Sequence, residues 1–167
     1  MLIYHPKNDI YNCMYRFISI AKLLPKEDFS FTRLRIYDFF FLFPHLALDI
    51  SFPRIKGIAQ LKKQAHLFQI PYEKLPDKKR LFSEISDYHI QALHILKAKN
   101  IFDVNEDILS LGENFVVESV KSLFNENVYI TNDFFSQLIN ALEHVDTSGE
   151  NGLKARTGLM EFRYDAV

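Results

Sequence analysis

A phenylalanine-rich block near the N-terminus constrains the fold of this chain more than any other part of its sequence. The block reads DFSFTRLRIYDFFFLFP, runs from Asp28 to Pro44, and holds six phenylalanines: Phe29, Phe31, Phe39, Phe40, Phe41 and Phe43. A surface helix turns only one stripe toward a core, so a helix that is apolar on every side must be buried on most of its circumference. Either the rest of this chain or a partner protein has to cover it.

Two other segments offer apolar stripes that match this block. The segment near the N-terminus offers Ile10, Met14, Phe17 and Ala21. The segment near residue 138 offers Phe134, Leu138 and Leu142. The three- and four-residue spacing places each set on one face of a helix. We therefore predict that most of the phenylalanines belong to a core built within this chain.

The same spacing predicts six helices along the chain. We expect them at residues 10–24, 31–43, 55–68, 86–100, 113–124 and 132–145. Asn8 or Asp9 is placed to cap the first helix, Ser30 the second and Thr131 the last. A shorter helical turn is expected over residues 77–85, and an irregular or short helical connection after Pro44.

Two kinds of segment predict β-structure. Leu2, Ile3 and Tyr4 predict a short strand, and the apolar runs 101–104 and 108–111 flank three turn-forming residues. Two such runs around a turn predict a hairpin. The expected fold class is mainly α with a small β hairpin (α+β). A helix followed by a hairpin is also the ending of a winged-helix unit, a scaffold that serves both DNA reading and protein contacts.

The length of 167 residues favours a single domain, 1–167. Within it we expect a helical N-terminal part at 1–76, a winged-helix-like part at 77–125, and a C-terminal helix with a docking tail at 126–167. Residues 146–152 are rich in turn formers and predict a loop. The segment beyond it predicts a terminal strand or an extended docking segment, whose candidate docking residues are Lys154, Arg156, Phe162, Arg163 and Tyr164.

The motifs of common catalytic sites are missing from the sequence. It contains no GxxxxGK[ST], GxGxxG or HExxH, and Cys13 is its only cysteine. Cys13 lies on an apolar helix face, which favours burial over catalysis. Arg33 and Arg35 begin the phenylalanine-rich helix and, with Asp38, favour structural ion pairs over an anion site. We predict no enzyme activity, no cofactor, no metal, and no catalytic or cofactor-binding residue.

Charge is unevenly distributed along the chain. Residues 54–99 hold ten basic and four acidic residues, a local net charge of +6, whereas residues 100–167 hold four basic and twelve acidic ones, a net charge of −8. This asymmetry favours two different binding faces. Two ordinary solvent-exposed faces would explain it equally well. The candidates for contact with DNA or a partner are Lys62, Lys63, Lys78, Lys79, Arg80, Lys97 and Lys99.

The sequence predicts a cytoplasmic protein. Its longest apolar stretch falls far short of the roughly 20 residues of a membrane span. The N-terminus, MLIYHPKNDIYN, lacks the basic region, apolar core and cleavage site of a secretory signal.

Three stretches together resemble a known family. They are IYHPKNDIYNCMYRFISIAKLL, FTRLRIYDFFFLFP and NGLKARTGLMEFRYDAV. They are similar to the middle component of ABC three-component systems, the bacterial defence modules that include Lamassu. The resemblance implies a small accessory subunit that bridges an SMC- or Rad50-like ABC ATPase and a larger effector, often a nuclease, with DNA met through the complex. It implies no catalytic residues.

Two alternatives stay open beside this interpretation. The helix and hairpin at 86–111, with the +6 region, suit a winged-helix DNA-binding regulator that acts as a homodimer. A small hydrolase or nuclease is a third and weaker reading, since scattered acidic residues are its only support.

Overall fold

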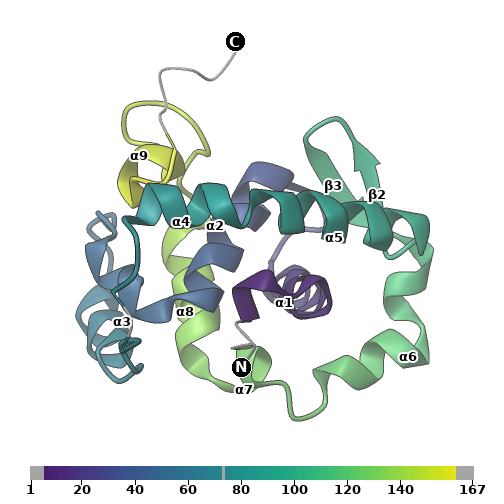
Figure 1. Ribbon diagram of the computed structural model, residues 1–167, viewed down its shortest axis with the longest axis horizontal. Helices are drawn as coiled ribbons and strands as arrows, with labels where there is room; N and C mark the ends of the chain where they lie inside the picture. The colour runs from purple at the N-terminus through teal and green to yellow at the C-terminus, as the bar shows by residue number, and fades with distance from the viewer. Residues whose placement is uncertain (1–5, 73, 161–167) are drawn as a thin grey trace.

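The computed structural model describes residues 6–72 and 74–160, and it is mostly helical with a small three-stranded antiparallel sheet (Figure 1). The predicted α+β class is confirmed. The helices are α1 (Ile10–Leu23), α2 (Phe31–Leu42), α3 (Ile58–Ala65), α4 (Lys78–Glu84), α5 (Ser86–Ala98), α6 (Glu118–Lys121), α7 (Val128–Thr131), α8 (Asp133–Leu142) and α9 (Leu153–Thr157). Within the described residues, none of these helices has the length and apolar character that crossing a membrane requires.

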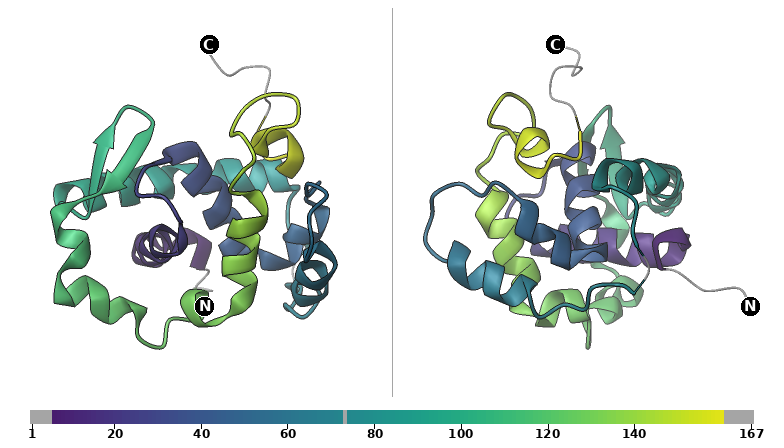
Figure 2. Two further views of the ribbon diagram at one scale, coloured as in Figure 1. Left: turned by 180° about the vertical axis from the view of Figure 1, so that it is seen from behind. Right: turned by 60° about the vertical axis from the view of Figure 1, so that its left-hand side comes forward.

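Short 3-10 segments and strands connect these helices. The 3-10 segments are η1 (Pro6–Asn8), η2 (Pro44–Asp49), η3 (Glu113–Val116) and η4 (Ser122–Phe124), and the strands are β1 (Phe29–Ser30), β2 (Phe102–Asn105) and β3 (Ile108–Leu111). Helix α1 lies in the middle of the molecule, with the β2–β3 hairpin on one side of it and α8 on the other (Figures 1 and 2).

Side-chain caps start the first two helices where the sequence predicts them. Asp9 accepts a hydrogen bond from the backbone of Asn12 and begins α1. Ser30 does the same for Arg33 and begins α2. Each cap satisfies a backbone N–H that has no partner within its helix. Helix α2 ends just before Pro44, whose ring cannot continue a helix.

The phenylalanine-rich block forms the centre of the core. Five of its six phenylalanines are buried, namely Phe29, Phe39, Phe40, Phe41 and Phe43. Rings from three other helices cover α2: ring centroids lie 6.3 Å apart for Phe17 and Phe31, 5.9 Å for Phe39 and Phe82, and 4.6 Å for Phe41 and Phe135. The cover therefore comes from the same chain, from α1 and α8 as predicted and also from α4.

The sheet joins two distant parts of the chain. The predicted hairpin is confirmed as β2 and β3, with Asn105 opposite Ile108. The two-residue strand β1 pairs with the other edge of β3, so the strand order is β1-β3-β2. After β3 the chain turns at Gly112, where a side chain would collide with the Asn100 carbonyl oxygen, only 2.3 Å from the Cβ position. Glycine lets the strand pass close to the end of α5.

Residues 113–124 do not form the single helix predicted from their apolar spacing. They form η3, α6 and η4, because Val117 adopts an extended conformation, with ψ 154°, between the first two. Val116 and Val117 are exposed, and Phe115 and Val120 are buried. The valines therefore do not belong to a buried helical stripe, and the segment makes short turns around its buried residues.

Three smaller predictions at element boundaries were wrong. Asn132, and not Thr131, caps α8, since its side chain accepts a hydrogen bond from Phe134 and Thr131 instead ends the short helix α7. Helix α3 begins at Ile58 and not at residue 55, because the preceding Gly57 has a left-handed φ of +93°. Residues 153–157 form α9 in place of the expected extended segment. The strand predicted at residues 2–4 lies outside the described residues.

Candidate functional site

A buried ion pair links the first two helices. Arg16 on α1 donates from Nε to Asp38 Oδ1 over 2.7 Å and from Nη2 to Asp38 Oδ2 over 3.1 Å. Arg16 is 2% exposed and Asp38 is fully buried. The planar guanidinium matches both carboxylate oxygens at once, so this geometry fixes the position of one helix against the other.

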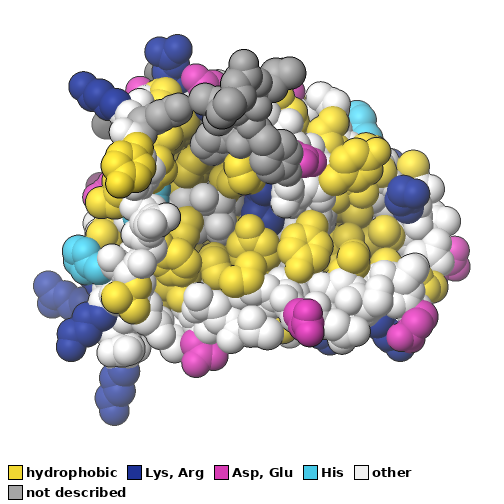
Figure 3. Space-filling view, turned by 60° about the horizontal axis from the view of Figure 1, so that its bottom comes forward, with side chains coloured by type: hydrophobic (Ala, Val, Ile, Leu, Met, Phe, Trp, Pro, Cys, Tyr) yellow, Lys and Arg dark blue, Asp and Glu magenta, His cyan; other side chains and the backbone are white. Residues whose placement is uncertain are grey.

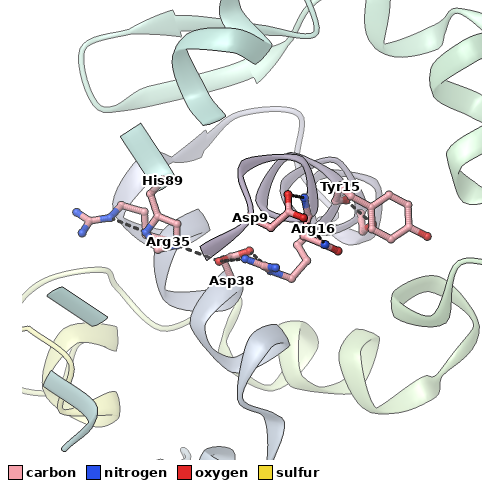
Figure 4. A network of polar contacts seen from close by, with 8 residues as sticks. Asp9, Tyr15, Arg16, Arg35, Asp38 and His89 are labelled. Atoms are coloured by element: carbon pink, nitrogen blue, oxygen red, sulfur yellow. Dashed lines mark hydrogen bonds and ion pairs between the residues drawn. The ribbon is translucent and has the colours of Figure 1, made fainter. Parts of the chain in front are cut away.

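His89 extends the ion pair to a third helix. Its Nε2 lies 2.9 Å from Asp38 Oδ2, and its Nδ1 accepts from Arg35 Nε over 3.3 Å, as Figure 4 shows. Arg35 can only donate, so we assign the ring proton to Nε2, where it is donated to Asp38. Arg35 also donates to Ser86 Oγ at the start of α5. The Arg16–Asp38–His89–Arg35 network thus joins α1, α2 and α5.

The pKa shifts in this network agree with its hydrogen bonds. Burial alone would raise the pKa of Asp38, but the charge of Arg16 and the hydrogen bond from His89 bring it below the usual 3.8. Burial lowers the pKa of His89 below 6.5, and this outweighs the attraction of Asp38. Asp38 is therefore ionised and His89 neutral at pH 7, and the charge of Arg16 balances that of Asp38.

Cys13, Asp38 and His89 bring three metal-ligating atoms within 4.8 Å of one another. Their bonding does not fit a metal centre. Both oxygens of Asp38 and both ring nitrogens of His89 are engaged by neighbouring side chains. Burial raises the pKa of the Cys13 thiol, so the thiolate that a metal requires is disfavoured. The guanidinium of Arg16 already neutralises the carboxylate of Asp38 that a metal ion would need.

The chemistry open to this network is positioning and not catalysis. A general acid or base must reach its substrate, and Arg16, Asp38 and His89 are all buried away from the surface. Their effect is to hold three helices in one arrangement. The predicted partner of Asp38 was wrong: Arg16 pairs with it, whereas Arg33 donates to Tyr37 Oη and to the carbonyl oxygens of Leu142 and Val145.

The basic residues predicted to contact DNA or a partner do not form one patch. Lys62 and Lys63 lie on α3, Lys78, Lys79 and Arg80 begin α4, and Lys97 and Lys99 lie at the far end of α5. Helices α4 and α5 run nearly end to end with only Ile85 between them (Figure 1). At 1.5 Å per residue, about 30 Å separates the last two groups. Arg80 also pairs with Glu84.

The C-terminal residues predicted to dock fall into two groups. Arg156 donates to the carbonyl oxygens of Asn151 and Ser51, and the backbone of Ser51 donates to Arg156. Lys154 is buried. These contacts hold α9 against the loop that follows η2. Phe162, Arg163 and Tyr164 lie outside the described residues.

The role of His89 and Arg16 was missed at the sequence level. One signal was available: Asp38 is the only acidic residue in a helix that is otherwise rich in phenylalanine, and a buried carboxylate needs a cationic or hydrogen-bonding partner. The partners lie 22 and 51 residues away, so spacing alone could not identify them.

Comparison with known proteins gives one match. A search of curated proteins found no similar sequence, and a search of solved structures found no similar chain. The model of one protein family, described as ABC-three component (ABC-3C) system Middle Component 5, matches residues 2–165. That match covers nearly the whole chain of 167 residues. The chain therefore belongs to the middle component 5 family of ABC-three component systems.

Proposed function

We propose that this protein is a non-catalytic subunit that bridges an SMC- or Rad50-like ABC ATPase and a nuclease effector in a bacterial defence complex of the Lamassu type. The family match over residues 2–165 is the observation that carries the proposal, because a middle component of a three-component system works with two others. Both partners are proteins, and the complex, not this chain alone, meets DNA.

Two features of the molecule support a bridging role. Its polar network is buried and stabilises the packing of the helices. Asp38 and His89, whose pKa values are shifted, therefore lie where no substrate can reach them. The chain also carries a net charge of +6 over residues 54–99 and −8 over residues 100–167. A protein that contacts two partners can use regions of opposite charge to bind each partner selectively.

Co-purification tests this proposal directly. The full chain, tagged at one end, is co-expressed with the other two components of its system and isolated by affinity. We expect both components to be retained with it in a fixed ratio. Recovery of this chain alone, whichever end carries the tag, would overturn the proposal.

A second candidate function rests on the topology of the sheet. The order α1, β1, α2, α5, β2, β3, with strand order β1-β3-β2, is compatible with a winged helix that carries residues 44–84 as an insertion before its third helix. In such a unit α5 would be the recognition helix and the β2–β3 hairpin the wing. The topology thus favours a winged-helix scaffold, and with it the alternative of a homodimeric DNA-binding regulator.

The charges of the hairpin favour protein contact over DNA contact on this scaffold. Asp103, Glu106 and Asp107 are exposed on it, and phosphates would repel them. A binding assay with the promoter DNA of its own gene separates the two functions. A regulator would bind tightly at moderate salt and lose affinity in Lys97→Glu. We expect only weak binding that disappears as salt rises.

A further inference from the structure

We propose that the junction between α3 and α8 binds an extended, acidic segment of another component of the complex. This inference rests on the bridging function proposed above and specifies how one partner is held. Two cavities lie along the junction. One, of about 360 Å³, is lined by residues that include Ile55, Lys56, Gln60, Gln137 and Asn140. The other, of about 280 Å³, is lined by Gln64, Leu67, Phe68, Asn132 and Phe134.

Both cavities are lined by α3 and its C-terminal turn on one side and by α8 and its cap on the other, and we call the surface along them the α3–α8 groove. Gln60 and Gln64 are four residues apart on α3, and Gln137 and Asn140 are three apart on α8, so each pair lies on one face of its helix. From Gly57 to Leu67 the groove is about 15 Å long at 1.5 Å per residue. An extended segment of about five residues fills that length at roughly 3.3 Å each.

Free amide groups line this groove. Gln64 Oε1 is buried and has no hydrogen-bond partner within the described residues. The side chains of Gln60, Gln137 and Asn140 also make no hydrogen bond to any described part of the chain. Each amide offers both a donor and an acceptor. The backbone of a helix is satisfied internally, whereas an extended backbone offers unpaired N–H and C=O groups, so these amides favour an extended ligand.

Each cavity also has an exposed apolar side chain at its edge. Ile55 is 47% exposed beside the first cavity, and Leu67 is 85% exposed beside the second. A partner segment with two apolar side chains would bury both. Nucleic acid fits this surface poorly, because Phe68 and Phe134 pack on each other with centroids 4.9 Å apart and offer no free ring for stacking.

The charge of the groove selects an acidic segment. Residues 54–72 contain four basic residues and no acidic one. Lys56 lines the first cavity, and Lys63 lies on the same side of α3 as Gln60 and Leu67. Asp133 begins α8 nearby but lines neither cavity. Figure 3 shows Lys and Arg side chains gathered at the left, the side on which α3 lies in Figure 1.

Photocrosslinking within the complex tests this assignment. The full chain carries p-benzoylphenylalanine in place of Gln60, or in place of the exposed Gln91 on α5 as a control, and is co-expressed with the other two components. We expect crosslinks from position 60, and not from position 91, to a short segment of one component that is rich in Asp, Glu and apolar residues. Crosslinks to a second copy of this chain or to DNA would overturn the inference.

A pair of isosteric substitutions gives a second readout. Gln60→Glu with Gln137→Glu removes two donors and sets two negative charges against the acidic segment, so the amount of partner retained should fall by about tenfold or more. The charge-matched control, Gln91→Glu with Asn151→Asp, should retain as much partner as the unmodified chain. If the two double variants retained equal amounts of partner, the groove would not be the binding site, and the proposed bridging function would be unaffected. Failure of the unmodified chain to retain any component would overturn both.

Discussion

Arg16 on α1 and Asp38 on α2 form a two-point ion pair in the core, with a distance of 2.7 Å from Arg16 Nε to Asp38 Oδ1 and of 3.1 Å from Arg16 Nη2 to Asp38 Oδ2. Both charges are removed from water, so each depends on the other for its stabilisation. The pair therefore makes the packing of α1 on α2 highly sensitive to a change at either residue.

Removing one partner of this pair should strongly destabilise the protein. We expect Asp38→Asn to lower the free energy of unfolding by about 3–5 kcal/mol, because it leaves the charge of Arg16 buried and uncompensated. Urea denaturation followed by circular dichroism measures the change. Glu84→Gln is the matched control, because it disrupts exposed ion pairs to Lys7 and Arg80 and should barely move the midpoint. Similar midpoints for both variants would contradict the role assigned to Asp38.

Stability should fall as the pH drops below about 6.5. Burial lowers the pKa of His89 in the folded state, so the unfolded chain binds a proton first and acid favours unfolding. The stabilisation is complete above pH 6.5 and is lost as the pH falls toward the lowered pKa, at up to about 1.4 kcal/mol per pH unit for one proton. The lowered pKa of Asp38 adds a second loss below pH 3.8.

Unfolding midpoints between pH 7.5 and 5 test the contribution of His89. We expect His89→Gln, which keeps a donor for Asp38, to flatten the dependence on pH. His94→Gln on the exposed side of α5 should leave it unchanged. His45 has a pKa lowered by partial burial and contributes a slope of the same sign in every variant. A slope that survives intact in His89→Gln would rule out His89 as its main source.

Truncating the centre of the phenylalanine-rich block should unfold or precipitate the protein. Phe40 is fully buried, and Phe40→Ala is expected to cost about 3–5 kcal/mol through lost burial and the cavity it leaves. The soluble yield and the thermal midpoint measure this loss. Leu67→Ala removes a side chain that is 85% exposed and should leave both nearly unchanged. A soluble, stable Phe40→Ala protein that had lost only its partners would make the block an interface.

The hairpin turn contains a residue whose replacement by glycine should stabilise the fold. Glu106 has a φ of +54°, in the left-handed region that disfavours residues with a Cβ. Glu106→Gly removes this strain and should raise the free energy of unfolding by up to about 1 kcal/mol. Glu118→Gly in α6 is the contrasting control and should lower it by about 1 kcal/mol. Chemical denaturation of both variants measures whether the free energy of unfolding rises or falls. A loss of stability in Glu106→Gly would contradict the strain assigned to Glu106.

Local signals allowed much of the helical fold to be predicted. Asp9 and Ser30 are caps that act within three residues, and the hairpin around Glu106 and Asp107 is equally local. Strand β1 could not be predicted, because two residues carry no alternation and its partner lies about 80 positions away. The break at Val117 could not be predicted either, because the apolar residues around it are spaced as in a continuous helix.

The site residues divide in the same way. Lysine clusters are visible in any sequence, but the structure separates Lys78 from Lys97 by the length of α4 and α5. Gln60 and Gln137 have no charge and no motif, and only the packing of α3 on α8 brings them together. The network around His89 likewise exists only after α1, α2 and α5 have met.

The pairing of β1 with β3 has a consequence for synthesis on the ribosome. Phe29 cannot reach Leu109 until some 80 further residues have been made, which takes about 4–16 s at 5–20 residues per second. Phe41 waits longer still, because Phe135 covers it. During that interval the phenylalanine-rich helix α2 lacks the cover of α8, and a chaperone that binds aromatic segments should be found on it. Nascent chains stalled after residue 100 should be protease-sensitive there, and chains in which α8 has emerged and packed on α2 should be protected.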